Sequence, residues 1–209
     1  MPLSAWTGTR FLTSVAEPAE LPAEGLPEIA FAGRSNVGKS SAINALANRR
    51  RLAFVSRAPG RTRTINFFDL GERGRLVDLP GYGYAQVSQQ MRAGWERLVD
   101  AYLVRRSLAG VVLLMDARHP LTASDRAFLH RLGALQPPRL VLLTKSDKLP
   151  RVRAAEAHAR TLGRLRDAGT PARVLLFSSK DATGVGDARA VLEGWLRDSG
   201  PEAGRKGPR

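Results

Sequence analysis

The chain has 209 residues, and its 33 Lys and Arg against 19 Asp and Glu give a formal net charge of +14 at pH 7. Hydrophobic residues make up 43% of the chain and cysteine is absent, which predicts an ordinary buried core and excludes wholesale disorder, disulfide frameworks, zinc–thiolate sites, iron–sulfur clusters and thiol catalysis. No stretch approaches the roughly 20 apolar residues of a membrane-spanning helix, and the first residues lack a signal-peptide pattern, so we expect a cytoplasmic protein with no membrane partner.

Short apolar runs alternate with longer helical patterns, which predicts an α/β fold with crossover helices. Residues 1–26 contain several prolines and one strand-like segment, 10–15, and we expect them to form an N-terminal extension that covers an edge of the sheet. Strands are predicted at 28–33, 65–70, 75–79, 110–116, 140–144 and 173–177. Helices are predicted near 37–48, 88–106, 123–134, 150–168 and 185–198.

The order of these elements predicts the sheet. Residues 71–74 have the composition of a hairpin turn, so the two strands that they join are expected to be antiparallel. The last three predicted strands are continuously apolar, as in parallel strands buried on both faces. We therefore expect a six-stranded, mostly parallel sheet with one antiparallel edge strand and helices on both faces. This single domain spans 27–198, and the basic tail at 199–209 is expected to be disordered.

A phosphate-binding motif, G-x-x-x-x-G-K-[ST], lies after a predicted strand and at the start of a helix. In such a loop the backbone N–H groups surround the β-phosphate, Lys39 neutralises the β and γ oxygens, and Ser40 supplies a hydroxyl to Mg²⁺. The strand–turn–helix context argues against a plain glycine-rich turn. We expect nucleotide contacts from Gly33, Arg34, Ser35, Asn36, Val37, Gly38, Lys39 and Ser40.

A second motif decides which base the nucleotide carries. Residues 144–147 read TKSD directly after a buried strand, and they resemble the [NT]-K-x-D guanine motif of GTPases. Asp147 can accept hydrogen bonds from the N1–H and the N2 amine of guanine, whereas adenine has no matching pair of donors. The alternative is a loop Asp that caps the next helix. We expect guanine contacts from Thr144, Lys145, Ser146 and Asp147.

Two further segments fit the same fold in the right order. Asp78, Leu79, Pro80 and Gly81 match D-x-x-G, in which the Asp holds Mg²⁺ through water and the Gly amide contacts the γ-phosphate. Phe177, Ser178, Ser179 and Lys180 resemble the S-A-K loop that reaches guanine O6 through a backbone amide. Because Ser-Ser at a helix start is also common capping chemistry, the second assignment rests on the order of the motifs.

With these motifs placed, residues 59–68 (PGRTRTINFF) and 78–85 (DLPGYGYA) closely resemble the EngB family of bacterial ribosome-biogenesis GTPases, also called YihA or YsxC, within the Era-like translation-associated group. The resemblance covers nearly the whole chain, from about residue 10 to 197, and implies a P-loop NTPase fold of the Ras-like G-domain type. It also implies GTP binding and hydrolysis coupled to assembly of the large ribosomal subunit, and an association with normal growth, septation and cell division.

By that resemblance, Thr62 is the switch-loop residue whose hydroxyl and carbonyl reach Mg²⁺ and the γ-phosphate. Thr64 is its rival from spacing alone, and a loop Thr that merely starts a turn is the plainer interpretation. Gly60, Arg61 and Arg63 are expected in the nucleotide site beside them. The resemblance thus assigns catalysis to Lys39, Thr62 and Gly81, and Mg²⁺ binding to Ser40, Thr62 and Asp78.

Tyr82 follows D-x-x-G, where signalling GTPases carry a water-positioning Gln, so unassisted hydrolysis is expected to be slow. A partner or a monovalent cation must then complete the site. An Asn at the position of Asn36 is associated with K⁺ coordination in related Era-like GTPases, but Asn is also well tolerated in a strained turn. Positive charge from Arg61, Arg63 or a ribosomal group is the competing explanation.

The net charge of +14 favours a polyanionic partner, which in the cytosol is above all RNA. We therefore expect GTP or GDP, Mg²⁺ and, as an option, K⁺ as cofactors, and the large ribosomal subunit or its precursor and rRNA as partners of a monomer. One alternative is a nucleotide-dependent rRNA-binding module with incidental hydrolysis. A small-molecule phosphotransferase is another, although it needs neither a guanine motif nor a switch Thr.

Overall fold

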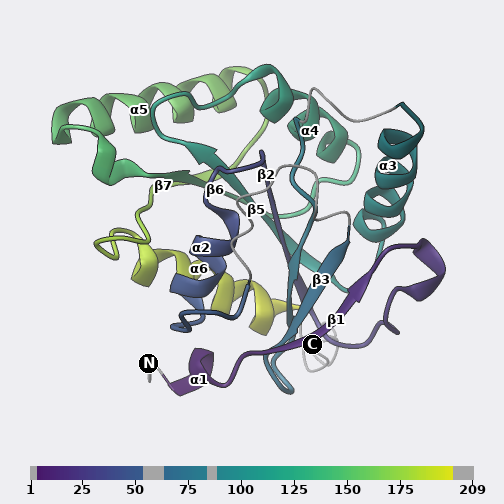
Figure 1. Ribbon diagram of the computed structural model, residues 1–209. Coiled ribbons are helices and arrows are strands. Elements are labelled where there is room, and N and C mark those ends of the chain that lie inside the picture. Colours follow the sequence, from purple (N-terminus) through teal and green to yellow (C-terminus); the bar gives the residue numbers. More distant parts are fainter. Residues whose placement is uncertain (1–3, 54–63, 84–88, 200–209) are drawn as a thin grey trace, which may run out of the picture.

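The structure is a computed structural model that describes residues 4–53, 64–83 and 89–199. At its centre is a seven-stranded sheet with the order β1–β3–β4–β2–β5–β6–β7 (Figure 1). The strands are β1 (Arg10–Val15), β2 (Glu28–Gly33), β3 (Ile65–Asp69), β4 (Arg75–Asp78), β5 (Leu108–Asp116), β6 (Arg139–Thr144) and β7 (Arg173–Leu176). The helices are α1 (Ser4–Thr7), α2 (Lys39–Leu46), α3 (Gln89–Leu103), α4 (Ala123–Gly133), α5 (Arg151–Asp167) and α6 (Val185–Asp198), with 3₁₀ turns η1 (Pro18–Glu20) and η2 (Ser146–Lys148).

The predicted α/β fold is confirmed, but the prediction of six strands is wrong. Residues 10–15 pair with β3 and form a seventh strand, β1, at the edge of the sheet. The antiparallel strand is β3, as the hairpin turn predicted, yet β3 lies between β1 and β4 and not at the edge. β1 satisfies the backbone groups that β3 would otherwise expose. The division between extension and domain at residue 27 stays a prediction.

Helices cover both faces of the sheet (Figure 1). Successive residues of a strand point to opposite faces. In β2, Ala30 and Ala32 belong to the core cluster with α3, α4 and α5, whereas Ile29 and Phe31 belong to the cluster with α2 and α6. Burial on both sides explains why this strand reads as a continuous apolar run. No helix in the described part of the chain is long and apolar enough to cross a membrane.

The carboxyl ends of five strands meet at one edge of the sheet, because β2, β4, β5, β6 and β7 run parallel. The register pairs Gly33 of β2 with Leu114 of β5, and Asp116 at the end of β5 with Thr144 at the end of β6. The motifs that begin at Gly33, Asp78 and Thr144 therefore share this edge, the usual place of ligand sites in open α/β sheets.

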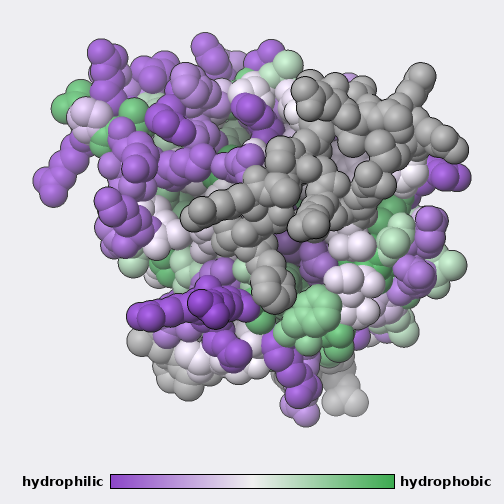
Figure 2. All heavy atoms as spheres, in the orientation of Figure 1, coloured by the Kyte–Doolittle hydropathy of each residue, from purple (hydrophilic) through white to green (hydrophobic). Residues whose placement is uncertain are grey.

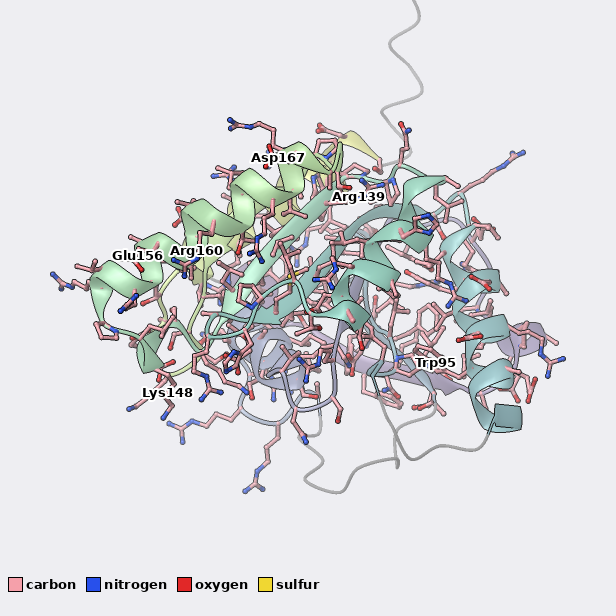
Figure 3. All side chains as sticks on the ribbon, turned by 90° about the horizontal axis from the view of Figure 1, so that it is seen from above. Trp95, Arg139, Lys148, Glu156, Arg160 and Asp167 are labelled. Carbon is pink, nitrogen blue, oxygen red and sulfur yellow. The ribbon has the colours of Figure 1, made fainter. Side chains whose placement is uncertain are left out.

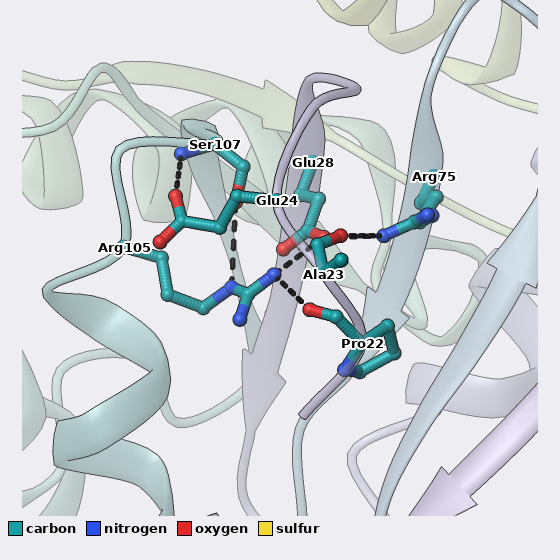
Figure 4. Close-up of polar contacts among 7 residues, drawn as sticks. All are labelled: Pro22, Ala23, Glu24, Glu28, Arg75, Arg105 and Ser107. Carbon is teal, nitrogen blue, oxygen red and sulfur yellow. Dashed lines mark hydrogen bonds and ion pairs between the residues drawn. The ribbon is translucent and has the colours of Figure 1, made fainter. Parts of the chain in front are cut away.

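At the amino ends of the parallel strands lies a buried charge cluster around Glu28, the first residue of β2 (Figure 4). Glu28 is fully buried, and its Oε1 lies 3.2 Å from Nη1 of Arg75 and 3.3 Å from Nη2 of Arg105. The same guanidinium groups donate to the carbonyl oxygens of Ala23 (3.0 Å) and Pro22 (2.7 Å). The cluster thus ties the segment before β2 to β4 and to the loop after α3.

Arg105→Ala should destabilise the fold by about 3 kcal/mol, because it removes one of the two guanidinium groups that neutralise the buried carboxylate of Glu28. Denaturant unfolding measures this change. The matched control is Arg153→Ala, which breaks an exposed pair with Glu156 and should change the free energy of unfolding by no more than about 0.5 kcal/mol. Equal losses in the two variants would contradict the assignment of Glu28 as a structural anchor.

Candidate functional site

The phosphate-binding loop lies between β2 and α2, as predicted. β2 ends at Gly33, and α2 begins at Lys39. Two residues of the loop have positive φ, Asn36 at 59° and Gly38 at 105°. The φ of Gly38 would strain any residue with a Cβ, so glycine is needed to turn the chain into the helix. The first N–H groups of α2, which carry the positive end of the helix dipole, follow directly on the loop.

Lys39 and Asp78 form an ion pair at the centre of the site. The ammonium group of Lys39 contacts Oδ1 of Asp78, and both side chains are largely buried. Asp78 is the last residue of β4, and its register partner in β2 is Phe31. Ser40 is the residue after Lys39 in α2 and is partly buried. Two adjacent parallel strands thus bring the predicted phosphate and metal ligands together.

The oxygen donors of the site fit a magnesium ion. Ser40 offers a hydroxyl and Asp78 a carboxylate, the hard oxygen ligands that Mg²⁺ prefers. In residues 4–53, 64–83 and 89–199, no group of three or more His, Cys, Asp or Glu side chains is placed to hold a metal ion. Mg²⁺ in nucleotide sites is usually held by one or two side chains together with phosphate oxygens and water.

Tyr82, the residue that follows the D-x-x-G motif, is hydrogen-bonded to the phosphate-binding loop. The N–H of Ser35 donates to the carbonyl of Tyr82, and the N–H of Tyr82 donates to the carbonyl of Gly33, both at 3.2 Å. Gly81 lies so close to the loop that a Cβ there would come within 3.2 Å of the nitrogen of Ser35. The two motifs are therefore connected through their backbones.

The side chain of Tyr82 is buried in the core. The residue is 6% exposed, its ring stacks on Phe128 with centroids 5.0 Å apart, and its hydroxyl donates to Oδ1 of Asp125 at 3.0 Å. Burial raises the pKa of the Tyr82 hydroxyl far above its ordinary value, and the Asp125 carboxylate raises it further. The hydroxyl therefore keeps its proton and its partner, so it is not free to position an attacking water.

Two side chains bond the guanine motif to the phosphate-binding loop. Thr144 is buried at the end of β6, and its hydroxyl lies 2.7 Å from the carbonyl oxygen of Val37 and 3.1 Å from that of Met115. The ammonium group of Lys145 donates to the carbonyl of Asn36 at 2.9 Å. These bonds hold the loop after β6 against the loop after β2, so one ligand can contact both.

Asp116 orients Lys145, although the sequence did not single it out. It is the last residue of β5, and its carboxylate lies 3.1 Å from Nζ of Lys145. Arg118 binds the same carboxylate through Nε at 2.9 Å and Nη2 at 2.7 Å. The Arg118 guanidinium and, after it, Lys145 hold the pKa of Asp116 well below its usual range, so the carboxylate stays ionised. Its position at the end of a buried strand was the only sequence signal.

The loops after β6 and β7 meet at Asp147. The hydroxyl of the fully buried Ser178 donates to Oδ1 of Asp147 at 3.0 Å. The N–H of Lys180 donates to Oγ of Ser178 at 3.2 Å. The N–H of Ser146 donates to the carbonyl of Phe177 at 3.2 Å and joins the two loops. Ser178 thus holds the carboxylate that is predicted to bind the base.

Four other predicted residues differ in their exposure. Arg34 and Ser179 are exposed, whereas Leu79 is buried. The N–H of Leu79 donates to the carbonyl of Phe31 at 3.0 Å and continues the pairing of β2 and β4 beyond Asp78. Pro80, between Leu79 and the glycine of D-x-x-G, is also buried, so this motif leaves the sheet as a packed segment.

Most of the predicted switch loop lies outside the described residues. This part includes Gly60, Arg61, Thr62 and Arg63, and residues 200–209 of the predicted tail lie outside as well. Thr64 is described: it directly precedes β3, and its hydroxyl lies 3.3 Å from Oδ1 of Asn66. The choice of Thr62 over Thr64 as the switch residue stays a prediction.

Comparison of sequences identifies related proteins. The family model of the 50S ribosome-binding GTPases matches residues 28–145, from the start of β2 into the guanine motif. The probable GTP-binding protein EngB of Burkholderia thailandensis is 48% identical over 198 residues, which cover 90% of this chain and 90% of that protein. The similarity therefore includes the phosphate-binding loop, D-x-x-G and the guanine motif.

Solved structures share the fold. A crystal structure of a probable GTP-binding protein EngB matches with a TM-score of 0.60 and 23% identity, over 82% of this chain and 99% of that one. Era in complex with MgGDPNP and nucleotides 1506–1542 of 16S ribosomal RNA matches with a TM-score of 0.66 and 16% identity, over 83% of this chain and 57% of that one. At these identities the likeness establishes the P-loop GTPase fold.

Asp147→Asn should weaken GTP and GDP binding by at least about tenfold and admit xanthine nucleotides, because an amide presents a donor where guanine's donors need an acceptor. Affinities for GTP and XTP check this. Ser178→Ala, the control, keeps the carboxylate but removes its hydrogen bond, so it should weaken GTP binding less and not admit XTP. Unchanged base preference in Asp147→Asn would remove Asp147 from the site.

Proposed function

The chain belongs to the EngB family of GTP-binding proteins and is a GTPase, and from this premise we propose that it is a GTP-hydrolysing switch in assembly of the large ribosomal subunit. We place it in the cytoplasm as a monomer. Its role there would support normal growth, septation and cell division, as the resemblance implies for the family.

One observation carries the proposal: the loops predicted to bind guanine and phosphate are bonded to each other. Thr144 reaches the carbonyl of Val37, and Lys145 reaches that of Asn36. The base and the phosphates lie at opposite ends of a nucleotide, so a protein can read both at once only if its two loops keep a fixed spacing. Loops held in place before binding lose less conformational entropy when the ligand arrives. This supports guanine nucleotides as the ligand.

Each predicted phosphate or metal ligand has a proposed role. Lys39 would exchange Asp78 for the β and γ oxygens of the nucleotide, while Ser40 and Asp78 would hold Mg²⁺, the latter through water. Bound Mg²⁺ supplies positive charge that neutralises the phosphate oxygens. The amide of Gly81 and the hydroxyl and carbonyl of Thr62 would respond to the γ-phosphate, which distinguishes GTP from GDP.

A concentration of positive charge on α5 supports an RNA-containing partner. Exposed basic residues on and just before this helix are Lys148, Arg151, Arg153, Arg160, Arg164 and Arg166. With the two acidic residues Glu156 and Asp167, this segment has a net charge of +4, whereas α6 has two basic and three acidic residues. Figure 2 shows hydrophilic side chains gathered over α5. Figure 3 shows Glu156, Arg160 and Asp167 along this helix and Lys148 just before it. Such a surface attracts the phosphate backbone of RNA.

The names of related proteins support the same partner. The matching family is described as 50S ribosome-binding GTPases, and Era has been crystallised with a segment of 16S ribosomal RNA. Era shares only the fold with this chain, so its RNA is support by analogy. The charge of the chain is an independent argument for an RNA partner.

Binding to large ribosomal subunits should fall steeply with salt, because each neutralised phosphate releases condensed counterions. Arg160→Gln with Arg164→Gln should lower the slope of log affinity against log salt by about 2. The control pair, Arg97→Gln with Arg106→Gln, removes the same charge from exposed positions elsewhere and should leave the slope unchanged. A flat salt response of the wild type would mean that the basic surface is not the contact face.

GTP turnover should be slow in NaCl, faster in KCl, and faster again with large ribosomal subunits. If Asn36 holds K⁺, positive charge lies where negative charge accumulates in the transition state, and Asn36→Ala should abolish the difference between the salts. Turnover in equal concentrations of the two salts, with and without subunits, measures both effects.

The outcomes of this experiment separate the alternatives. Equal rates in both salts would reject the cation and leave Arg61, Arg63 or a ribosomal group as the source of charge. Nucleotide-dependent binding to subunits without stimulated turnover would favour an RNA-binding module with incidental hydrolysis. Transfer of the γ-phosphate to a small molecule, with no response to subunits, would favour a phosphotransferase.

A further inference from the structure

Tyr82 connects the phosphate-binding loop to a helix that carries none of the predicted motifs. Its backbone is bonded to Ser35 and Gly33 of the loop. Its hydroxyl donates to Asp125, which lies 43 residues further along the chain in the first turn of α4. Tyr82 therefore contacts both the phosphate-binding loop and the first turn of α4.

Asp125 is held in one orientation by two groups of donors. It is 1% exposed, and its Oδ2 accepts from the N–H of Thr122 at 2.9 Å and from the hydroxyl of Thr122 at 2.7 Å. Thr122 is the N-cap of α4. The bond from its N–H, together with the bond from the N–H of Asp125 to the Thr122 hydroxyl oxygen at 3.4 Å, forms a capping box. The cap occupies Oδ2, while Oδ1 faces the hydroxyl of Tyr82. The helix end thus fixes an acceptor for Tyr82.

We propose that Asp125 is a positioning residue for GTP hydrolysis, which holds Gly81 against the phosphate-binding loop through the hydroxyl of Tyr82. Gly81 directly precedes Tyr82, and a Cβ on Gly81 would lie 3.2 Å from the nitrogen of Ser35. The amide expected to meet the γ-phosphate is therefore held at the loop before the nucleotide arrives. This inference rests on the proposed role of Gly81.

The packing alone does not require the hydroxyl of Tyr82. Its ring stacks on Phe128, with 15° between the ring planes, and a phenylalanine could make the same contact. A buried hydroxyl and a buried carboxylate are costly to desolvate unless they are paired with good geometry. The hydrogen bond from the Tyr82 hydroxyl to Asp125 therefore fixes the position and direction of the segment after D-x-x-G. Packing of the ring alone would not fix the direction.

The hydrogen bond between Tyr82 and Asp125 should affect the affinity for GTP and not that for GDP, because only GTP has the γ-phosphate that Gly81 would contact. Tyr82→Phe should weaken binding of a non-hydrolysable GTP analogue and lower kcat by about three- to tenfold, the range expected for one buried hydrogen bond. The affinity for GDP should stay within about twofold of wild type, because it does not depend on that bond. A purely structural role would lower both affinities together.

The experiment measures GDP and GTP-analogue affinities with Mg²⁺ by calorimetry, and kcat in parallel. Asp125→Asn changes the other partner of the same hydrogen bond. The double variant with Tyr82→Phe should lower the ratio of GTP-analogue to GDP affinity no further than Tyr82→Phe alone, because both changes act on one interaction. Thr122→Ala is the matched control. It removes the hydroxyl bond to Asp125, but the N–H of residue 122 still donates to Oδ2 and the bond to Tyr82 is kept. It should therefore lower stability without changing the ratio of GTP-analogue to GDP affinity.

Three results would overturn the inference: equal losses for both nucleotides, no loss for either, or tighter binding of the GTP analogue. Gly81→Ala distinguishes this failure from a failure of its premise. If Gly81→Ala leaves the ratio of GTP-analogue to GDP affinity unchanged, the proposed contact of Gly81 is wrong, and the inference is overturned with it. The ribosomal role is tested separately, by the binding of wild-type protein to large subunits.

Discussion

The parallel register of the central strands is the constraint on which the site depends. Hydrogen bonds hold neighbouring strands about 4.8 Å apart, so the last residue of each strand has a fixed neighbour. Lys39 meets Asp78 because β2 and β4 are adjacent, and Lys145 meets Asp116 because β5 and β6 are adjacent. A slip of one residue would turn the strand-end side chains of Asp78 and Asp116 to the other face of the sheet. The apolar packing that fixes the register therefore also positions the polar groups.

Hydrogen bonds between the loops at the carboxyl ends of the strands then fix the positions of these loops relative to one another. Thr144 binds the loop after β2, Ser178 binds the loop after β6, and Tyr82 joins the loop after β4 to the phosphate-binding loop. Removing the partner of a buried polar group destabilises the fold. Each loop therefore depends on its neighbour for its own conformation. A substitution in one loop should thus alter its neighbours as well. We therefore expect recognition of the base and of the phosphates to be coupled through Thr144 and Lys145.

The sequence was informative where structure is local and limited where it is not. Apolar runs located the strands from 28 onward, and the motifs were found because each follows such a run. β1 was harder to assign, since Phe11 and Leu12 are exposed and this edge strand is held by pairing with β3 more than by burial. The contacts of Asp116 with Lys145 and of Asp125 with Tyr82 join distant segments. Neither has a spacing that a motif could record.

The charges of the chain fall into two groups with different consequences. The ion pairs of Lys39 with Asp78 and of Glu28 with its two arginines are buried and largely protected from salt. The basic residues of α5 are exposed, so salt should weaken partner binding without disturbing the nucleotide site. A switch that couples nucleotide hydrolysis to partner binding would therefore need a mechanical link between the two regions. α4 packs on the same face of the sheet as α5 and receives the Tyr82 hydrogen bond through Asp125, so a γ-phosphate bound at Gly81 would act on α4 first.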